Sequence, residues 1–476
     1  MIDVRNPRTG QIDYRIERTL PAELRDASDG LRTAQRDWAA LDPAARSAVL
    51  RRWADAIEEE LPAIVSAVCA DTGRLGISRI EGQTLVQLIQ RWADLAPEMI
   101  ARVESEQRPT VHSAITTRTT LVPYPVVGVI SPWNFPLILS MIDAVPALAA
   151  GCAVLIKPSE VTPRFVEPLV KATSRVPELA AVLRFALGDG ETGAAMIEVV
   201  DYVCFTGSVP TGRKVAEAAA RAFIPASLEL GGKDPMIVLA SAEPEAAAEI
   251  ALRASIVNNG QACQSIERIY VERPILEPFL AALTAKAEDV MLNYPDIEAG
   301  DIGPFIFCNQ ARIVQDQLDE ATSRGARILT GGVVEELDGG LYLRPTVLTD
   351  VTEDMRIVSD ETFGPVLPVM AVDSVDEAVT RANDSRYGLS AAVIAGSAEE
   401  AEAIGARLEV GAVSINDGSL TGIVWEAEKT SFGESGLGPS RMGESALLRF
   451  CRRRVLMRQS GKALTIADYG DRPPAN

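Results

Sequence analysis

The sequence is short of histidine, and this limits the catalytic mechanisms that it can use. His112 is the only histidine among 476 residues. A Ser-His or Cys-His mechanism therefore has a single candidate base, and His112 lies in a Thr- and Arg-rich segment far from any glycine turn. We expect any general base to be a Glu, Asp or Lys side chain instead.

Cysteine is also sparse. The six cysteines are Cys69, Cys152, Cys204, Cys263, Cys308 and Cys451. They are widely scattered and no two form a CxxC pair, so neither a disulfide framework nor a zinc site is indicated, and we expect no metal. This usage is typical of a reducing compartment and predicts a cytoplasmic protein.

Positive charge is in short supply. Lys and Arg number 46 against 66 Asp and Glu, a net charge of −20, which argues against nucleic acid and anionic membrane surfaces as partners. No run of 18 apolar residues occurs, and the N-terminus lacks the apolar stretch of a signal peptide. We therefore expect no membrane span.

The chain is long enough for two domains or more, and its pattern from Val126 onward is that of an α/β protein. Strands are predicted at 126–130, 153–157, 182–187, 202–206, 236–239, 268–273 and 367–372. Helices are predicted at 42–57, 136–149, 163–173, 211–222, 244–258, 277–290, 309–323 and 377–383. Such alternation predicts parallel sheets covered by helices on both faces.

Cys263 lies at the centre of the segment N-N-G-Q-A-C-Q-S-I-E-R, residues 258–268. Gly260 lets the backbone bend before the thiol, and the small Ala262 allows close approach to it. A cysteine on a tight turn at a sheet edge is a candidate nucleophile. The alternative at this point is a buried structural cysteine.

Polar residues follow three predicted strands, where parallel sheets bind ligands. They are Ser131, Lys157 with Glu160, and Gly207 with Ser208 and Gly212. A strand that runs through Gly-Ser into a helix N-terminus can hold a pyrophosphate, although the G-x-G-x-x-G fingerprint is absent. Glu160 can accept from a ribose 2′-OH and repel a 2′-phosphate, which favours NAD over NADP; it can also be a helix N-terminal carboxylate.

Two further segments contain features that can be either functional or structural. Glu229 lies in an apolar strand that stops at two glycines, so it is either a paired structural charge or a base. Residues 110–122 alternate Thr, Val, Ser and Ile and predict an exposed hairpin or arm, which is either a dimer contact or a solvated surface.

Several motifs occur in one order. They are Pro132-Trp-Asn-Phe-Pro136, Lys157-Pro-Ser-Glu160, Phe205-Thr-Gly-Ser208, Leu228-Glu-Leu-Gly-Gly232, Gly260-Gln-Ala-Cys263 and Glu361-Thr-Phe-Gly-Pro365. Together they resemble the NAD(P)-dependent aldehyde dehydrogenase superfamily, over nearly the whole chain.

The resemblance implies roles for individual residues. Cys263 matches the catalytic thiol, Glu229 the general base and Asn134 the oxyanion-stabilising amide. Cofactor-binding positions are matched by Ser131, Trp133, Lys157, Glu160, Gly207, Ser208, Gly212, Leu230, Glu361 and Phe363. Substrate-lining positions are matched by Phe135, Met141, Ile142 and Trp425. The cofactor implied is NAD, with NADP as an alternative.

The resemblance also implies an architecture. We expect a Rossmann-like NAD-binding domain (1–108 and 124–231), an α/β catalytic domain (232–440), a β-arm for oligomerisation (109–123 and 447–460) and a tail (461–476). Homodimers or homotetramers are expected.

The chain departs from the family pattern at Ser431-Phe-Gly-Glu434, which leaves the geometry of that loop open. Residues 417–429 are rich in apolar side chains, and no Arg pair suited to clamp a carboxylate is evident, so an aromatic or aliphatic aldehyde is the predicted substrate. Alternatives are CoA-dependent acylation, reduction of an activated acid, and a non-catalytic binding protein on the same fold.

Overall fold

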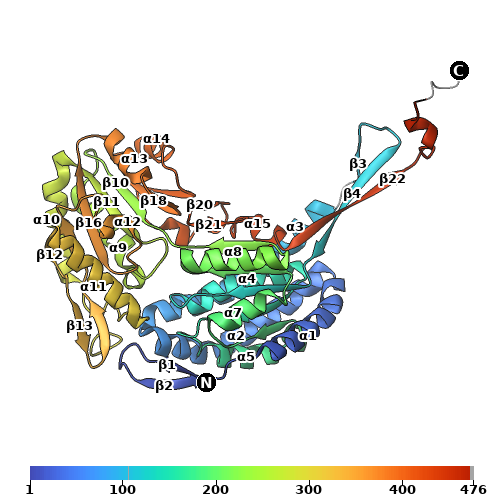
Figure 1. Cartoon of the computed structure of the whole chain (residues 1–476), viewed down its shortest axis with the longest axis horizontal. Helices are drawn as coiled ribbons and strands as arrows, with labels where there is room; N and C mark the ends of the chain where they lie inside the picture. The colour runs from blue at the N-terminus through green and yellow to red at the C-terminus, as the bar shows by residue number, and fades with distance from the viewer. Residues whose placement is uncertain (105–106, 472–476) are drawn as a thin grey trace.

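Two α/β lobes and a projecting β-arm make up the structure, a computed structural model that describes residues 1–104 and 107–471 (Figure 1). The N-terminal lobe carries the helices near the start of the chain, and the other lobe is formed mainly by residues after 232. The predicted α/β class with parallel, Rossmann-like sheets is confirmed.

The first lobe is built on a six-stranded sheet in the order β21-β9-β8-β5-β6-β7. All neighbouring strands are parallel except β21 and β9. The strands are β5 (Val126–Ile130), β6 (Ala153–Lys157), β7 (Leu183–Phe185), β8 (Tyr202–Thr206), β9 (Ala226–Glu229) and β21 (Gly436–Leu437). The helices are α1 (Pro21–Ala40), α2 (Pro43–Thr72), α3 (Leu75–Glu104), α4 (Pro136–Ala150), α5 (Val166–Ser174), α6 (Pro177–Ala180), α7 (Gly190–Ile197), α8 (Val209–Ala222) and α15 (Ser445–Leu448).

Helix α4 begins immediately after the Asn134-Phe135 pair, and its start is held by a buried carboxylate. Glu81 of α3 accepts hydrogen bonds from the backbone N–H groups of Leu137 and Ile138, both at 3.0 Å. These are orphan donors of the helix N-terminus, where a negative charge is favoured. Burial raises the pKa of Glu81 to about 7. The contact fixes the helix start and therefore the loop that presents Asn134.

The second lobe is built on a seven-stranded sheet in the order β12-β15-β16-β11-β10-β18-β19, parallel except for the β12–β15 pair. The strands are β10 (Asp234–Val238), β11 (Ile266–Glu272), β12 (Arg327–Thr330), β15 (Thr346–Thr349), β16 (Val366–Val372), β18 (Ser390–Ile394) and β19 (Ala412–Ile415). The helices are α9 (Pro244–Ile256), α10 (Leu276–Asp289), α11 (Cys308–Ser323), α12 (Arg356–Ser359), α13 (Val375–Asn383) and α14 (Ala398–Gly405). Alternate residues of β10 and β11 belong to two separate hydrophobic clusters, so both faces of this sheet are covered.

Two segments close to Cys263 and Glu229 differ from what the sequence predicted. Strand β11 begins at Ile266 rather than at 268, only three residues after Cys263. The residues after Ser431, whose loop geometry the sequence left open, form two short strands. Strand β20 (Phe432–Gly433) pairs with β17 (Tyr387–Gly388), and β21 adds to the edge of the first sheet, where Gly436 pairs with Glu229.

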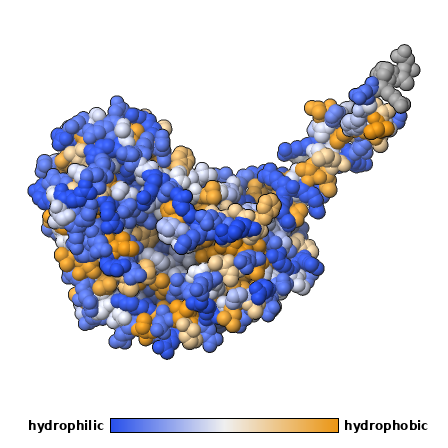
Figure 2. Space-filling view, viewed as in Figure 1, coloured by the Kyte–Doolittle hydropathy of each residue, from blue (hydrophilic) through white to orange (hydrophobic). Residues whose placement is uncertain are grey.

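The arm is a three-stranded antiparallel sheet of β3 (Gln107–Pro109), β4 (Ile115–Pro123) and β22 (Cys451–Gln459). Residues 110–122 were expected to form an exposed hairpin or arm, and β4 is the central strand of the arm because β22 pairs along its whole length and β3 pairs on its other side. The open edges belong to β3 and β22. Figure 2 shows apolar residues along the arm, and Val455, Leu456 and Met457 of β22 are exposed. Its role in oligomerisation stays a prediction.

The remaining elements lie at the periphery. They are the hairpins β1 (Ile2–Arg5) with β2 (Ile12–Ile16) and β13 (Val334–Leu337) with β14 (Gly340–Leu343), and the 3₁₀ helices η2 (Arg273–Ile275), η3 (Leu420–Gly422) and η4 (Ile466–Tyr469). The predicted tail 461–476 contains η4; residues 472–476 of that prediction lie outside the described residues. Within the described chain, no helix combines the length and apolar character needed to cross a bilayer.

Candidate functional site

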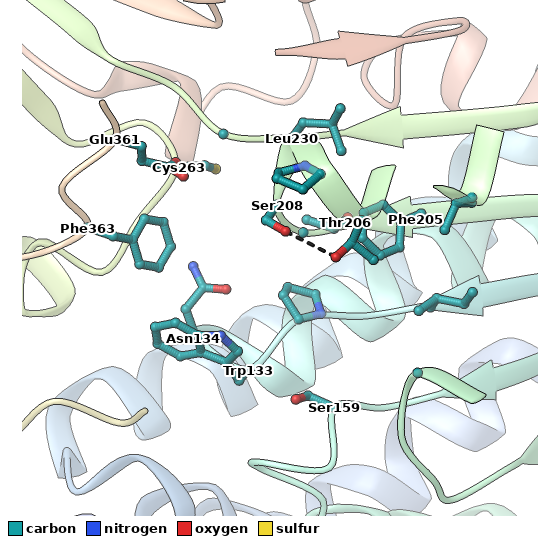
Figure 3. Close-up of a pocket in the computed structure, with 18 of the residues that line it drawn as sticks. Trp133, Asn134, Ser159, Phe205, Thr206, Ser208, Leu230, Cys263, Glu361 and Phe363 are labelled. Atoms are coloured by element: carbon teal, nitrogen blue, oxygen red, sulfur yellow. Dashed lines mark hydrogen bonds between the residues drawn. The ribbon is translucent and has the colours of Figure 1, made fainter. Parts of the chain in front are cut away.

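A cavity of about 880 Å³ lies between the two lobes, at the carboxyl ends of the first sheet's strands (Figure 3). Eleven of the residues singled out from the sequence line it. They are Ser131, Trp133, Asn134, Lys157, Glu160, Gly207, Ser208, Leu230, Cys263, Glu361 and Phe363. Residues more than 100 positions apart in the chain are therefore brought to one cleft, and their individual roles remain predictions.

Cys263 follows a turn with an uncommon backbone conformation. The 3₁₀ helix η1 (Val257–Gly260) contains Asn258, Asn259 and Gly260 with φ values of 60°, 57° and 66°. A side chain at Gly260 would lie 2.2 Å from the Gly364 carbonyl oxygen, so only glycine fits. Left-handed backbone at asparagine costs energy and persists where surrounding contacts enforce it.

Those contacts come from amide side chains. Asn258 Nδ2 donates to the Gln261 carbonyl at 2.9 Å and to the Asn134 carbonyl at 3.1 Å. Gln261 Oε1 accepts from the Ile306 N–H at 3.0 Å. The turn is therefore tied both to the loop after β5 and to the segment before α11, which fixes the backbone two residues before the thiol.

The surroundings of Cys263 disfavour the ionised form of its thiol. Burial, together with the nearby Glu361 carboxylate, raises the pKa of Cys263 to about 12, and only Lys429 opposes the shift among the main contributors. A thiolate is the reactive species. The site therefore has to remove this proton as the sulfur attacks.

Asn134 points its side-chain amide toward the turn that carries Cys263 (Figure 3). Its Nδ2 donates to the Gln261 carbonyl at 2.9 Å. The amide nitrogen has two hydrogens, so one N–H remains for a second acceptor. A donor held next to a nucleophile is suited to stabilise an oxyanion.

Glu229 ends β9 and is not among the residues that line the cleft. Its Oε2 accepts from Ser431 Oγ at 3.4 Å, and its Oε1 lies 4.0 Å from Arg441 Nε. Both partners come from the C-terminal segment that surrounds β21. The departure at Ser431 noted in the sequence therefore lies against the predicted base.

Glu361 and Phe363 are positioned by a buried ion pair. Lys233 Nζ contacts Glu267 Oε2 at 2.7 Å, and Glu267 accepts from the backbone N–H groups of Thr362 and Phe363, both at 2.8 Å. Glu361 in turn accepts from the Gly232 N–H at 3.0 Å. Burial and the Glu267 charge raise the pKa of Glu361 to about 8. This arrangement fixes residues 361–363 against the segment between β9 and β10 and against β11.

Aromatic rings line the middle of the cleft. Trp133 lies 5.4 Å from Phe363 in an edge-to-face contact and 5.9 Å from Phe307. Phe307 was missed from the sequence because it stands in an ordinary apolar run before α11. Flat apolar surfaces of this kind suit a planar ring.

The other end of the cleft suits a nucleotide. Lys157 Nζ lies 3.1 Å from Glu160 Oε2, and both side chains face the cavity. Helix α8 begins after Ser208, whose hydroxyl bonds to Thr211 Oγ1 at 3.2 Å rather than capping the helix, so the first-turn N–H groups are left for an anion. Gly212 lies outside the cavity; a Cβ there would meet Leu230 at 2.5 Å, so glycine lets α8 approach β9.

The four predicted substrate residues do not line the described cavity. Met141 is fully buried in the first hydrophobic cluster, and Ile142 is 8% exposed. Phe135 precedes α4, and Trp425 packs against the same cluster. Met141 lies in the core because residues 140–150 of α4 are all buried. Their assignment to the substrate stays a prediction.

No group of three or more His, Cys, Asp or Glu side chains with the geometry of a metal site occurs in residues 1–104 and 107–471.

Comparison with known proteins places the site in context. The sequence model of the aldehyde dehydrogenase family matches residues 1–456. A Mycolicibacterium smegmatis protein, named provisionally as an NADP-dependent succinate-semialdehyde dehydrogenase, is 39% identical over 81% of this chain and 75% of its own length. The structure of a provisionally named aldehyde dehydrogenase, PutA from Anabaena variabilis, is 50% identical with a TM-score of 0.95 and covers 98% of each chain. Betaine aldehyde dehydrogenase from Staphylococcus aureus, in complex with NAD+, is 29% identical with a TM-score of 0.90, covering 97% of this chain and 92% of that one.

Proposed function

Because this chain belongs to the aldehyde dehydrogenase family, we propose that it oxidises an apolar aldehyde to its carboxylic acid through a thioester on Cys263. The family assignment makes it an NAD(P)-dependent oxidoreductase that acts on an aldehyde group. The observation that carries the proposal is the hydrogen bond from Asn134 Nδ2 to the Gln261 carbonyl, which joins the predicted oxyanion donor to the nucleophile turn.

The cleft fits a nicotinamide dinucleotide. Lys157 and Glu160 would hold the adenosine ribose, and the start of α8 at Ser208 would hold the pyrophosphate. Only glycine fits at position 207, because a Cβ there would meet the Phe205 ring at 2.5 Å. When bound, the cofactor accepts the hydride that leaves the substrate carbon.

Three side chains, those of Cys263, Asn134 and Glu229, would carry out the remaining steps. The Cys263 sulfur adds to the aldehyde carbon and its proton passes to solvent water, while the carbonyl electron pair moves onto oxygen. The spare N–H of Asn134 and the backbone N–H of Cys263 would stabilise that oxyanion. Loss of hydride leaves a thioester. Glu229 would then take a proton from water as the water oxygen adds to the thioester carbon, the C–S bond breaks, and the Cys263 sulfur recovers a proton as the acid leaves.

The preference for an apolar substrate is supported by charge pairing near the nucleophile. Arg91 forms an ion pair with Glu426, and Arg253 forms one with Asp417. Both carboxylates belong to the segment 417–429, so these two guanidinium groups are already neutralised. The same segment exposes Ile423 (76%). An apolar aldehyde needs no counter-charge at such a surface.

A second candidate is a semialdehyde that carries a carboxylate. It is favoured by the name of the M. smegmatis relative, which refers to succinate semialdehyde. The two candidates differ in whether a free cation must face the far end of the substrate.

An aldehyde panel separates these candidates. We expect hexanal and benzaldehyde to be oxidised with kcat/KM at least about tenfold above that of succinate semialdehyde, because desolvating a carboxylate without a partner is costly. Reduced-cofactor formation at 340 nm measures the rates, with NAD and NADP in parallel. Faster turnover of succinate semialdehyde would reject the apolar preference and leave the aldehyde dehydrogenase activity intact. Acceleration by added CoA would instead favour the acylating alternative.

The cofactor preference rests on Glu160, which we propose accepts the ribose 2′-OH and repels a 2′-phosphate. We expect Glu160→Gln to raise the NADP-to-NAD ratio of kcat/KM by about tenfold, because it removes the negative charge and keeps the shape of the side chain. Glu191, an exposed carboxylate in the first turn of α7, supplies the matched control. Glu191→Gln should leave the ratio unchanged. An unchanged ratio in Glu160→Gln would show that selectivity is set elsewhere.

We also propose that the arm mediates self-association, as the family resemblance implied. The exposed apolar residues of β22 and its open edge support this.

A further inference from the structure

A buried cluster of three charged side chains lies next to the predicted general base. Asp143 of α4 is 1% exposed and contacts Arg441 Nη2 at 2.7 Å and Arg449 Nη2 at 2.5 Å. Both arginines come from the C-terminal segment that follows β21 and are themselves buried. Each guanidinium holds the pKa of Asp143 below its usual range, against the effect of burial.

The cluster does not balance its own charge. Two guanidinium groups face one carboxylate, which leaves one positive charge in excess in a region shielded from water. An uncompensated buried charge is strongly unfavourable, so a further anion is expected close by. The Nε atoms of both arginines lack a hydrogen-bond partner in the described structure.

Glu229 is the anion in the right place. Its Oε1 lies 4.0 Å from Arg441 Nε, while Arg441 Nη2 donates to Thr206 Oγ1 at 2.7 Å. Thr206 and Glu229 are paired residues at the ends of neighbouring parallel strands β8 and β9. Arg441 therefore lies against the strand ends that carry the base and is fixed from the opposite side by Asp143.

We propose that Arg441 is a positioning residue for Glu229 in thioester hydrolysis: its guanidinium holds this carboxylate at the end of β9, and Asp143 holds Arg441 in place. The inference rests on the proposed function, since it assigns Arg441 to the hydrolytic step. Arginine suits this role because its guanidinium stays charged at every working pH and offers several fixed N–H donors. Hydride loss needs no base at Glu229, so that step should not depend on Arg441.

The two arginines provide a matched pair of variants. Arg441→Met and Arg449→Met each remove one cation and leave one guanidinium facing Asp143, so the buried Asp143 carboxylate keeps a partner in both variants. They differ in contact with Glu229, which only Arg441 approaches among the ion pairs of the described residues. Arg441→Lys keeps the charge and loses the planar fork.

Rapid mixing with NAD and hexanal separates the two steps, because the first turnover reports thioester formation and the later rate reports hydrolysis. In Arg441→Met we expect the first-turnover burst within about twofold of wild type and the later rate lowered about tenfold or more. Arg449→Met should keep both rates within about threefold. Arg441→Lys should recover hydrolysis to within about threefold of wild type.

The proposal is overturned if Arg441→Met hydrolyses at the wild-type rate, if both Met variants lose hydrolysis equally, or if Arg441→Lys is as slow as Arg441→Met. Thermal melting confirms that each variant is folded, and Arg441→Gln replaces the Met variant if that one is not.

Hydrolysis of p-nitrophenyl acetate without cofactor repeats the comparison, since the ester acylates Cys263, releases p-nitrophenol and leaves a thioester for water to hydrolyse. A wild-type protein that cleaves the ester but oxidises no aldehyde would refute the proposed function alone.

Discussion

Replacement of Cys263 by alanine is expected to lower aldehyde oxidation by about 10⁴-fold, the largest effect among the variants considered. The sulfur forms the only covalent bond between protein and substrate in the proposed reaction, and no neighbouring side chain can replace it. Reduced-cofactor formation with hexanal measures the loss. NAD binding and thermal stability should change little, because the turn geometry is set by Asn258 and Gln261 rather than by the thiol.

Cys308 provides the matched control. It is a second partly buried free cysteine and begins α11, directly after the cleft residue Phe307. Cys308→Ala should retain wild-type activity within about twofold. Equal losses in both variants would contradict the assignment of Cys263 as nucleophile.

The raised pKa of Cys263 also predicts how the thiol reacts before the cofactor binds. Below a pKa of about 12 the thiolate fraction rises about tenfold for each pH unit. The rate at which iodoacetamide alkylates the protein without added cofactor should therefore rise about tenfold for each pH unit between pH 6 and pH 9. The rate measured with Cys263→Ala is subtracted, because it reports the other cysteines. A plateau near neutral pH would show that the thiol is already ionised.

Replacement of Glu229 by glutamine is expected to produce the second-largest effect, and it should affect only the second half of the reaction. The isosteric amide cannot accept a proton from water, so hydrolysis of the thioester should fall by about 10²- to 10³-fold. The first turnover should persist, because sulfur attack and hydride loss do not use this carboxylate. We expect the NADH concentration to rise rapidly by an amount equal to the enzyme concentration and then to increase only very slowly.

Ser431→Ala is the control for this variant. It removes a single 3.4 Å contact to Glu229 Oε2 and leaves the carboxylate in place, so hydrolysis should change by less than about threefold. Loss of the burst itself in Glu229→Gln would contradict the proposed division of steps. Rescue of Glu229→Gln by CoA would indicate that a thiol can replace water as acyl acceptor.

Much of the fold could be predicted from short-range pattern. The apolar runs at 126–130 and 153–157 are buried on both faces of a parallel sheet, and this is why they read as continuous hydrophobic segments rather than alternating ones. Asp42-Pro43 begins α2 as expected, with the Asp42 side chain accepting from the Ala44 N–H. Eleven residues singled out from the sequence line one cleft. This could be anticipated for those at strand ends, because the carboxyl ends of parallel strands lie at one edge of a sheet.

Which neighbour covers a surface was decided by tertiary packing. Residues 110–122 alternate like an edge strand, yet β22 joins them from more than 300 positions away. Met141 stands two helical turns beyond Asn134, but packing around α4 turns it into the core. Alternation and spacing state which residues share a face, and they do not state what that face meets.

The sequence by itself determined the chemistry of this protein: the thiol, the carboxylate, the amide and the glycines that bend the chain around them are properties of residue type and local order. Tertiary structure alone decided how that chemistry is supported. Asp143 in an apolar helix signals a partner, since a buried carboxylate must be paired, but the identity of that partner is not encoded nearby. Arg441 stands 212 residues after Glu229 in the chain. It reaches both Asp143 and Glu229 because the segment around β21 adds to the edge of the first sheet.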